Sequence, residues 1–386
     1  MPTNKTNEND NLLTALVSGC TAAAVSATLT YPLDFIKTQQ QLNNESYMKK
    51  FNVPPNYPNS LNQLFKGGSA LVLGSVFKNS TRLISYNWSS QFMAIDSHGH
   101  NSNKTTAPRI VIAGIMSAFF ETLTLVPFEN IKITMIQNQT FQNELNRIKD
   151  SKDITYDITG KSSHSHSQAF HAQKKPVYLR QFVSPHAYLS NDIIDQFRKN
   201  KVRFPLQSNK GSHIENLKAY YNKHPSLTFL GTIKEIYSLK GIKGFAAGTF
   251  ITFTRQIAIS WVWLSTYNAT RQLIDPHNKE NGWFNHKHTM WQSLGLHLLS
   301  SIAVITVTQP LDVIKTHVQS KNGKAIYRDS LTTAYKLFLN QGPLSLFKGS
   351  LPRFIKVLVS GGITATVYEY LEGIVNTAGG QKMFTY

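Results

Sequence analysis

Residues 31–38 read Tyr-Pro-Leu-Asp-Phe-Ile-Lys-Thr, and close variants of this octet occur twice more, at 126–132 and 309–316. All three segments have the form Pro-x-acid-x-x-Lys, with an apolar residue before the Lys. Each lies at the end of a stretch rich in apolar and small residues: 12–30, 110–126 and 294–308. One match would be chance, but three matches, each behind such a stretch, indicate an internal repeat.

A second element follows each octet. An aromatic residue and a glycine recur at 65–67, 245–248 and 347–349, and another apolar stretch comes after each of them. One unit is therefore a helix, the Pro-acid-Lys segment, a polar loop, the aromatic-Gly element and a second helix. Three units predict six spans of roughly 20–30 residues, long enough to cross a hydrocarbon layer of ~30 Å.

The spacing of the repeat is uneven, because Pro32 and Pro127 are 95 residues apart whereas Pro127 and Pro310 are 183 apart. The excess, at about 137–225, is polar and aperiodic, which predicts an inserted, largely disordered loop. The predicted organisation is a polar tail at 1–11, repeats at 12–106, 107–288 and 289–373, and a tail at 374–386.

Short amphipathic patterns at 227–238 and 330–339 predict two helices lying along the membrane surface. The first repeat has Pro54, Pro55 and Pro58 at the corresponding place, so its surface helix is expected to be broken or absent.

Composition narrows the class of protein. The 386 residues carry a net charge of +19, and the single cysteine, Cys20, excludes a disulfide framework or a cysteine zinc module. No nucleophile–base pair and no paired catalytic carboxylates stand out, so we expect no enzyme, no cofactor and no metal site. The first residues are polar, which argues against a cleaved secretory signal.

The charge is unevenly distributed among the loops. The loops between the two helices of each repeat carry 25 Lys and Arg against 10 Asp and Glu, whereas the termini and the other loops carry 7 against 6. Two spans per repeat return each repeat to the same side, so the repeats are parallel around a pseudo-threefold axis. The positive loops therefore face one side, and both termini face the other.

The triplicated motif resembles the mitochondrial carrier family over almost all of the chain outside 1–11 and about 137–225. The resemblance implies an all-α membrane protein with six transmembrane helices in three parallel tandem repeats, with short matrix-side surface helices. It also implies the mitochondrial inner membrane, both termini in the intermembrane space and a functional monomer. The expected partners are a small anionic metabolite and the lipid bilayer, with cardiolipin as a candidate lipid and no nucleic acid.

Charges inside membrane spans are costly and indicate function. Six belong to the motif and are expected to form a matrix gate of three interhelical ion pairs: Asp34, Lys37, Glu129, Lys132, Asp312 and Lys315. The alternative is that each acid pairs with the Lys of its own helix. Three prolines should kink the helices toward the axis: Pro32, Pro127 and Pro310. Gln41 and Gln319 should brace two pairs, whereas the second repeat has Ile136 there.

Family members also carry an outer gate, an aromatic-acid-x-x-base motif on the second helix of each repeat. The corresponding residues here are Tyr86, Tyr267, Arg271, Tyr368 and Glu369. Only Arg271 with Glu369 offers an ion pair, and Glu372 stands where the family has a base. The outer gate should therefore be weaker than the matrix gate.

The remaining span charges predict an electropositive funnel for an anion. Its expected substrate-binding residues are Lys78, Arg82, Arg255, Gln256, Arg353 and Lys356, with Glu121 the one further acid. Arg353 and Lys356 could instead reach lipid headgroups.

The pattern Lys78-x-x-x-Arg82, the pair Arg255-Gln256 and the spacing Arg353-x-x-Lys356 resemble the tricarboxylate (citrate) carrier branch. That branch has a further Arg where this chain has Trp263. The interpretation is transport of an organic polyanion, a di- or tricarboxylate, by alternating access and antiport. Two alternatives stay open: a carrier of a nucleotide or an amino acid, and a non-transporting carrier-fold scaffold or insertase.

Overall fold

The computed structural model describes residues 3–43, 60–94, 107–150, 184–189, 213–274, 290–327 and 329–380. Six long helices dominate this part of the chain: α1 (Thr3–Leu42), α4 (Gly68–Ala94), α5 (Ala107–Asp150), α9 (Thr249–Ile274), α10 (Met290–Gln319) and α13 (Ser350–Gly380). The described residues contain no strand, so the prediction of an all-α protein is confirmed.

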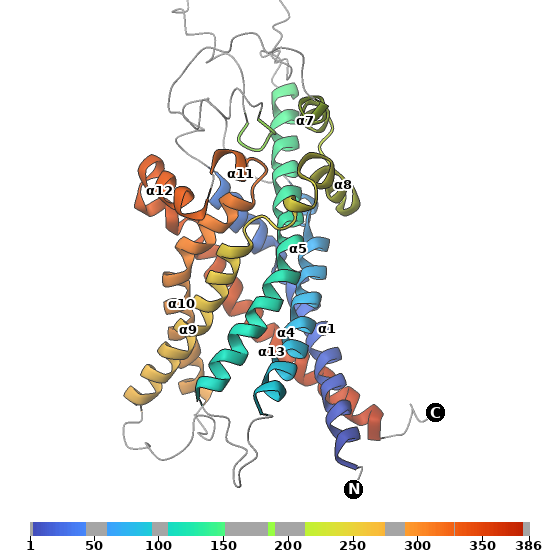
Figure 1. Ribbon diagram of the computed structural model, residues 1–386, viewed down its shortest axis with the longest axis vertical. Helices are drawn as coiled ribbons and strands as arrows, with labels where there is room; N and C mark the ends of the chain where they lie inside the picture. The colour runs from blue at the N-terminus through green and yellow to red at the C-terminus, as the bar shows by residue number, and fades with distance from the viewer. Residues whose placement is uncertain are drawn as a thin grey trace, which may run out of the picture.

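The six long helices pack against one another in chain order, and α13 returns to pack against α1 (Figure 1). The three helices that contain Pro32, Pro127 and Pro310, namely α1, α5 and α10, also contact one another. These three helices therefore meet inside the bundle. Figure 1 places the short helices α7, α8, α11 and α12 at one end, called the loop end below, and the start of α1 and end of α13 at the other, the terminal end.

Three of the helices are long and apolar enough to cross a membrane: the segments Thr14–Leu42, Ile112–Asn146 and Leu298–Gln319, within the described part of the chain. These segments lie in α1, α5 and α10. The other three long helices have 27, 26 and 31 residues. Large apolar side chains such as Leu29, Phe250 and Leu351 are 61–75% exposed. Apolar side chains exposed along long helices are typical of a protein surrounded by lipid.

The aromatic-Gly element forms the same turn three times. Gly67, Gly248 and Gly349 have φ angles of 91°, 78° and 77°, and each stands at the start of α4, α9 or α13. Only glycine adopts this left-handed conformation without strain. A side chain at Gly349 would lie 3.1 Å from the carbonyl oxygen of Lys37 on α1, so this turn packs directly on a neighbouring helix.

Short helices are present at the two segments predicted to form them, 227–238 and 330–339, as α8 (Phe229–Lys240) and α12 (Ser330–Gln341). Thr228 caps α8 by accepting a hydrogen bond from the amide of Gly231. Glycines 241 and 342, with positive φ, end the two helices. The remaining short elements are α3 (Leu61–Leu64), α7 (His213–Lys223), η2 (Ile242–Gly244), α11 (Gly323–Ile326) and η3 (Pro343–Phe347).

Four segments that were predicted as loop or tail contain helix. Helix α5 continues through residues 137–150, where a loop was expected, and α7 occupies 213–223 of the same predicted loop. Buried polar side chains such as Asn138 and Glu144 give that extension its packing, a pattern that a search for apolar periodicity does not detect. Helix α1 begins at Thr3 and α13 ends at Gly380, so residues 3–11 and 374–380 of the two predicted tails are helical. Residues 151–183 and 190–212 of the predicted loop, and Pro54, Pro55 and Pro58, lie outside the described residues.

Candidate functional site

Three ion pairs join α1, α5 and α10 where these helices meet. Each acid of the motif contacts the Lys of a different helix: Lys37 with Asp312 at 2.5 Å, Lys132 with Asp34 at 2.7 Å, and Lys315 with Glu129 at 2.7 Å. The pairs run in one direction around the bundle, so the three helices are closed into a ring, the ion-pair ring.

The alternative of pairing within each helix is represented once among the described contacts. Lys315 Nζ lies 3.9 Å from Asp312 Oδ1 on its own helix, against 2.7 Å to Glu129 on α5. The three acid side chains are between 1% and 11% exposed. Removing one partner of a buried pair costs about 3–5 kcal/mol, because the other charge is left uncompensated. The ring therefore resists separation of the three helices at this level.

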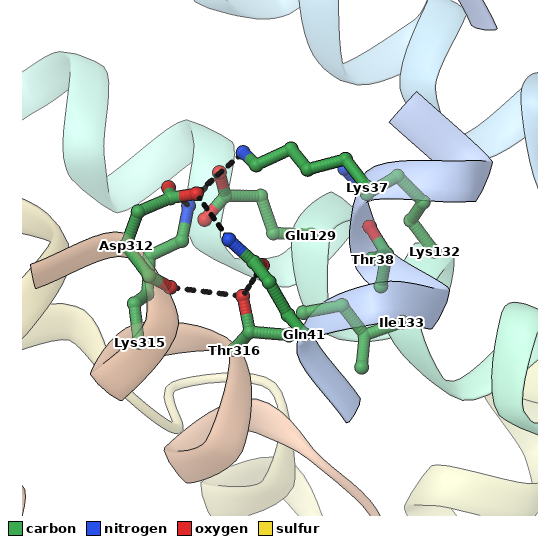
Figure 2. A pocket seen from close by; sticks show the side chains of 9 residues that line it. All are labelled: Lys37, Thr38, Gln41, Glu129, Lys132, Ile133, Asp312, Lys315 and Thr316. Carbon is green, nitrogen blue, oxygen red and sulfur yellow. Dashed lines mark hydrogen bonds and ion pairs between the residues drawn. The ribbon is translucent and has the colours of Figure 1, made fainter. Parts of the chain in front are cut away.

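Two glutamines, Gln41 and Gln319, hydrogen-bond to acids of the ring. Gln41 Nε2 donates to Asp312 Oδ2 at 3.1 Å and Gln41 Oε1 accepts from the Thr316 hydroxyl at 2.7 Å (Figure 2). Gln319 Nε2 donates to Glu129 Oε2 at 3.3 Å. In the second repeat, Ile136 is fully buried in an apolar cluster with Tyr31 and Phe35.

A small cavity of about 20 Å³ lies among these groups, room for about one water molecule. The side chains that line it come from all three Pro-containing helices (Figure 2): Lys37, Thr38, Gln41, Glu129, Lys132, Ile133, Asp312, Lys315 and Thr316. A cavity of this size is too small to hold a metabolite.

Two of the expected binding cations contact the ring itself. Lys356 Nζ on α13 lies 2.9 Å from Asp34 Oδ1, and Arg255 Nε on α9 lies 3.7 Å from Asp312 Oδ1. Asp34 thus faces both Lys132 and Lys356. The cations were expected to bind a ligand and the acids to form a gate, but in the structure these two sets of residues pair with each other.

Arg353 is held inside the bundle. Its guanidinium donates to Gln309 Oε1 at 3.0 Å and to Thr308 Oγ1 at 2.7 Å, and the residue is 7% exposed. Neither Arg353 nor Lys356 therefore extends to the lipid surface in this conformation. Neither Thr308 nor Gln309 was among the predicted site residues. The available signal was that Gln309 directly precedes the repeat proline, where the second repeat has the apolar Val126.

A second polar cluster surrounds Glu121, two helical turns before Glu129 on α5. Lys78 Nζ lies 3.2 Å from Glu121 Oε1, and Gln256 Nε2 donates to the same oxygen. Glu121 and Gln256 are 5% and 8% exposed. Arg82, one turn beyond Lys78, is exposed, and its guanidinium has no partner among the described residues. The adjacent residues Arg255 and Gln256 thus link the ion-pair ring to the Glu121 cluster.

The expected outer gate is only partly visible. Tyr86 on α4 is 44% exposed. Tyr267 and Arg271 lie within α9, and Tyr368 and Glu369 within α13, but these four side chains lie outside the described residues. The comparison of the two gates therefore stays a prediction.

Comparisons with known proteins agree with this architecture. A family model described as mitochondrial carrier protein matches residues 8–97 and 286–378, which contain the first and third octets. An uncharacterised mitochondrial carrier of Saccharomyces cerevisiae is 26% identical over 94% of this chain and 96% of its own length. The mitochondrial citrate transporter A of Aspergillus niger is 25% identical over 94% of each chain. A tricarboxylate transporter of Gibberella moniliformis is 24% identical over 96% of this chain and 92% of its own length.

The first family match covers most of α1 and all of α4, and the second covers α10 and most of α13, whereas the relatives align over 94% of this chain and so include most of the region between the two matches. Mitochondrial carriers as relatives indicate a multi-pass protein of the mitochondrial inner membrane. Together with the triplicated motif and the ring of ion pairs that it builds, these matches show that the chain is similar to mitochondrial carriers over nearly its whole length.

Proposed function

We propose that this protein carries an organic polyanion, a di- or tricarboxylate, across the mitochondrial inner membrane by alternating access. One observation carries the proposal: Arg255 and Lys356 pair with the ring carboxylates Asp312 and Asp34. A substrate carboxylate presents the same two oxygens as these aspartates. It can therefore take their place at the two cations.

The exchange of partners gives a physical route from binding to gate opening. When a substrate carboxylate binds Lys356, Asp34 retains only Lys132 of its two close cations. Charge-assisted hydrogen bonds contribute about 1.5–3 kcal/mol each, so the replacement is large enough to shift a balance between two conformations. The ring then weakens as the substrate binds, which is the coupling that a carrier requires.

The distribution of charge favours a carboxylate over the other ligand classes. Arg82 and Arg353 make no ion pair within 4 Å among the described residues, and Arg353 is fixed by the neutral groups Thr308 and Gln309. The cations of Arg82, Arg255, Arg353 and Lys356 lie on three different helices, as suits an anion with several carboxylates. Glu121 offsets Lys78, which lowers the positive charge available to a trivalent anion.

The full proposed architecture is six membrane spans in three repeats at 12–106, 107–288 and 289–373, related by a pseudo-threefold axis. We place the loop end in the matrix and both termini in the intermembrane space, because the loops between paired helices carry most of the positive charge. The protein works as a monomer in the lipid bilayer, with cardiolipin as a candidate lipid.

Uptake into proteoliposomes tests the proposal. Wild-type protein should exchange labelled citrate or malate against an internal di- or tricarboxylate, and should not exchange a nucleotide or a neutral amino acid. Arg255→Gln should lower the apparent affinity for the anion by roughly 10- to 100-fold, because one charge-assisted bond is lost. Trp263→Arg should add a cation and shift preference toward the tricarboxylate.

Lys243→Gln is the matched control, since Lys243 is an exposed cation shortly before α9 and is not among the proposed binding residues. Its uptake should equal that of the wild type. Absence of uptake for every carboxylate tested, with a correctly folded protein, would overturn the transport proposal and favour a scaffold. Exchange of nucleotides or amino acids in place of carboxylates would overturn the substrate class.

A further inference from the structure

Residues 184–189, called the strap, are a short piece of the inserted region that behaves as part of the protein core. Ser184, His186, Tyr188 and Leu189 are 1%, 2%, 6% and 3% exposed. The strap lies at the loop end beside α5 (Figure 1). A polar insertion that served only as a spacer would not bury these side chains.

One side of the strap is held by the second repeat. Ser184 Oγ donates to Glu144 Oε2 on α5 at 2.5 Å, and the Tyr188 hydroxyl donates to Glu235 Oε1 on α8 at 2.7 Å. Asn222 on α7 bonds Tyr188 twice: its Oδ1 accepts from the Tyr188 amide and its Nδ2 donates to the Tyr188 carbonyl, both at 2.9 Å. Burial and the nearby Glu235 raise the pKa of Tyr188 well above its usual value, so its hydroxyl stays a donor.

The other side of the strap is held by the third repeat. Asn322 Nδ2 donates to the Ala187 carbonyl at 2.8 Å, and Asn322 Oδ1 accepts from the Leu189 amide at 3.2 Å. Lys321 Nζ lies over the ring of Tyr188, 4.7 Å from its centre. Tyr188 therefore contacts α7 and α8 of the second repeat and Lys321 of the third.

The strap contacts join the same two repeats as one of the three ion pairs of the ring. Lys321 and Asn322 follow directly after α10, which ends at Gln319, and Glu144 lies fifteen residues after Glu129 on α5. The ion pair that joins the same two helices is Lys315 with Glu129. The strap and this pair therefore tie together the same two repeats, and the strap lies closer to the loop end.

We propose that the strap is a built-in clamp on the interface between the second and third repeats, which must leave its site before the loop end can open at that interface. The idea rests on the proposed alternating access, because only a carrier that opens its loop end needs the clamp to release. Opening separates α5 and α8 from the residues that follow α10. The strap is hydrogen-bonded to the second and to the third repeat at once, so it cannot keep both sets of bonds when the two repeats move apart.

Thiol labelling of a buried reporter tests the clamp. In a Cys20→Ser background, Ile133→Cys places a thiol in the wall of the cavity within the ion-pair ring, at a side chain that is 3% exposed. A small maleimide added from the loop end labels this thiol only when that end opens. Replacing residues 184–189 by an equally long Gly-Ser segment should raise the labelling rate by about fivefold or more, because the bonds to both repeats are lost.

Two point variants and a control sharpen the test. Tyr188→Ala and Asn322→Ala should raise labelling in the same direction, the second with the strap sequence intact. Tyr237→Ala, whose side chain on α8 is 60% exposed, should label at the wild-type rate. An unchanged rate in the Gly-Ser variant, with a wild-type circular dichroism spectrum, would overturn the clamp.

The same proteoliposomes separate the clamp from the proposed function. If wild-type protein takes up no carboxylate but labelling rises in the strap variants, the clamp stands and the substrate assignment fails. If uptake is normal and labelling does not respond to the strap, the substrate assignment stands and the clamp fails.

Discussion

The second repeat meets a requirement of the fold with different residues from the first and third. In the first repeat, the residue before the proline, Tyr31, donates its hydroxyl to the carbonyl of Lys66 in the aromatic-Gly turn. In the third repeat, Gln309 donates to the carbonyl of Lys348 at 2.7 Å. The second repeat has Val126 at this position, and valine has no donor.

Asn130, four residues later, supplies the missing donor. Its Nδ2 donates to the carbonyls of Phe245 and Ala247 at 2.8 and 3.1 Å. The first and third repeats have Phe35 and Val313 at the position of Asn130. The comparison teaches that the fold requires a donor to the buried carbonyls of the turn, and that either of two positions one helical turn apart can carry it.

The largest effect is expected at the ring, where all three repeats keep the same motif. Asp312→Ala should destabilise the closed ring by about 3–5 kcal/mol, because Lys37, Arg255 and Lys315 lose a shared buried partner. The labelling rate of Ile133→Cys from the loop end should rise strongly. Asp329→Ala, at an exposed acid before α12, is the control and should change nothing. An equal effect of Glu372→Ala on accessibility from the terminal end would contradict the expected weaker outer gate.

A swap of donors between repeats tests the comparison directly. Asn130→Val should cost about 1–3 kcal/mol, because two buried carbonyls lose their donor, and the thermal midpoint should fall by a few degrees. Adding Val126→Gln, which copies the third repeat, should recover part of that loss. If the double variant is no more stable than Asn130→Val, the two positions are not equivalent.

The strap, which belongs to the second repeat alone, should respond to pH. Burial, with the positive charge of Lys321, lowers the pKa of His186 to about 3, and Glu144 Oε1 lies 3.9 Å from its Nε2. His186 is therefore neutral while the strap is docked, but it can take up a proton once the strap is released. Docking is fully favourable above the ordinary histidine pKa of about 6.5 and weakens as pH falls below that value. The loss is about 1.4 kcal/mol for each pH unit below that value.

Labelling of Ile133→Cys by a reagent whose reactivity is corrected for pH should therefore be faster at pH 5.5 than at pH 7.5, by up to about tenfold and by no more than in the Gly-Ser variant. His186→Asn removes the titrating group and should flatten this dependence. If His186→Asn keeps the wild-type dependence of labelling on pH, that dependence comes from another titrating group.

The smallest effects are expected at the two braces. Gln41 makes two hydrogen bonds, to Asp312 and from Thr316, whereas Gln319 makes one longer bond to Glu129. Gln41→Leu should cost about 1–2 kcal/mol and Gln319→Leu about 0.5–1 kcal/mol, measured as thermal stability in detergent. Equal losses would show that the amides contribute through packing rather than through these bonds.

The sequence by itself determined the members of the ion-pair ring. A spacing of three residues keeps the acid and the Lys of each motif near one face of the helix. Because the motif occurs three times, three helices that face one another can pair each acid with the Lys of the next helix in a closed ring. The positions of the two surface helices also followed from local periodicity and from their terminal glycines. These features depend on neighbours within one or two helical turns, which a sequence displays directly.

Only the tertiary structure decided which distant groups share a partner. The contacts of Lys356 with Asp34, of Arg255 with Asp312 and of Tyr188 with Glu235 join residues 322, 57 and 47 positions apart. Whether such groups meet depends on how each helix is rotated and where it crosses the next, which is fixed by side-chain packing across the whole bundle. The use of Asn130 as hydrogen-bond donor, in a repeat where the residue before the proline is Val126, was equally invisible in the sequence. A repeat pattern shows which residues recur, but not which buried carbonyl each residue must bond.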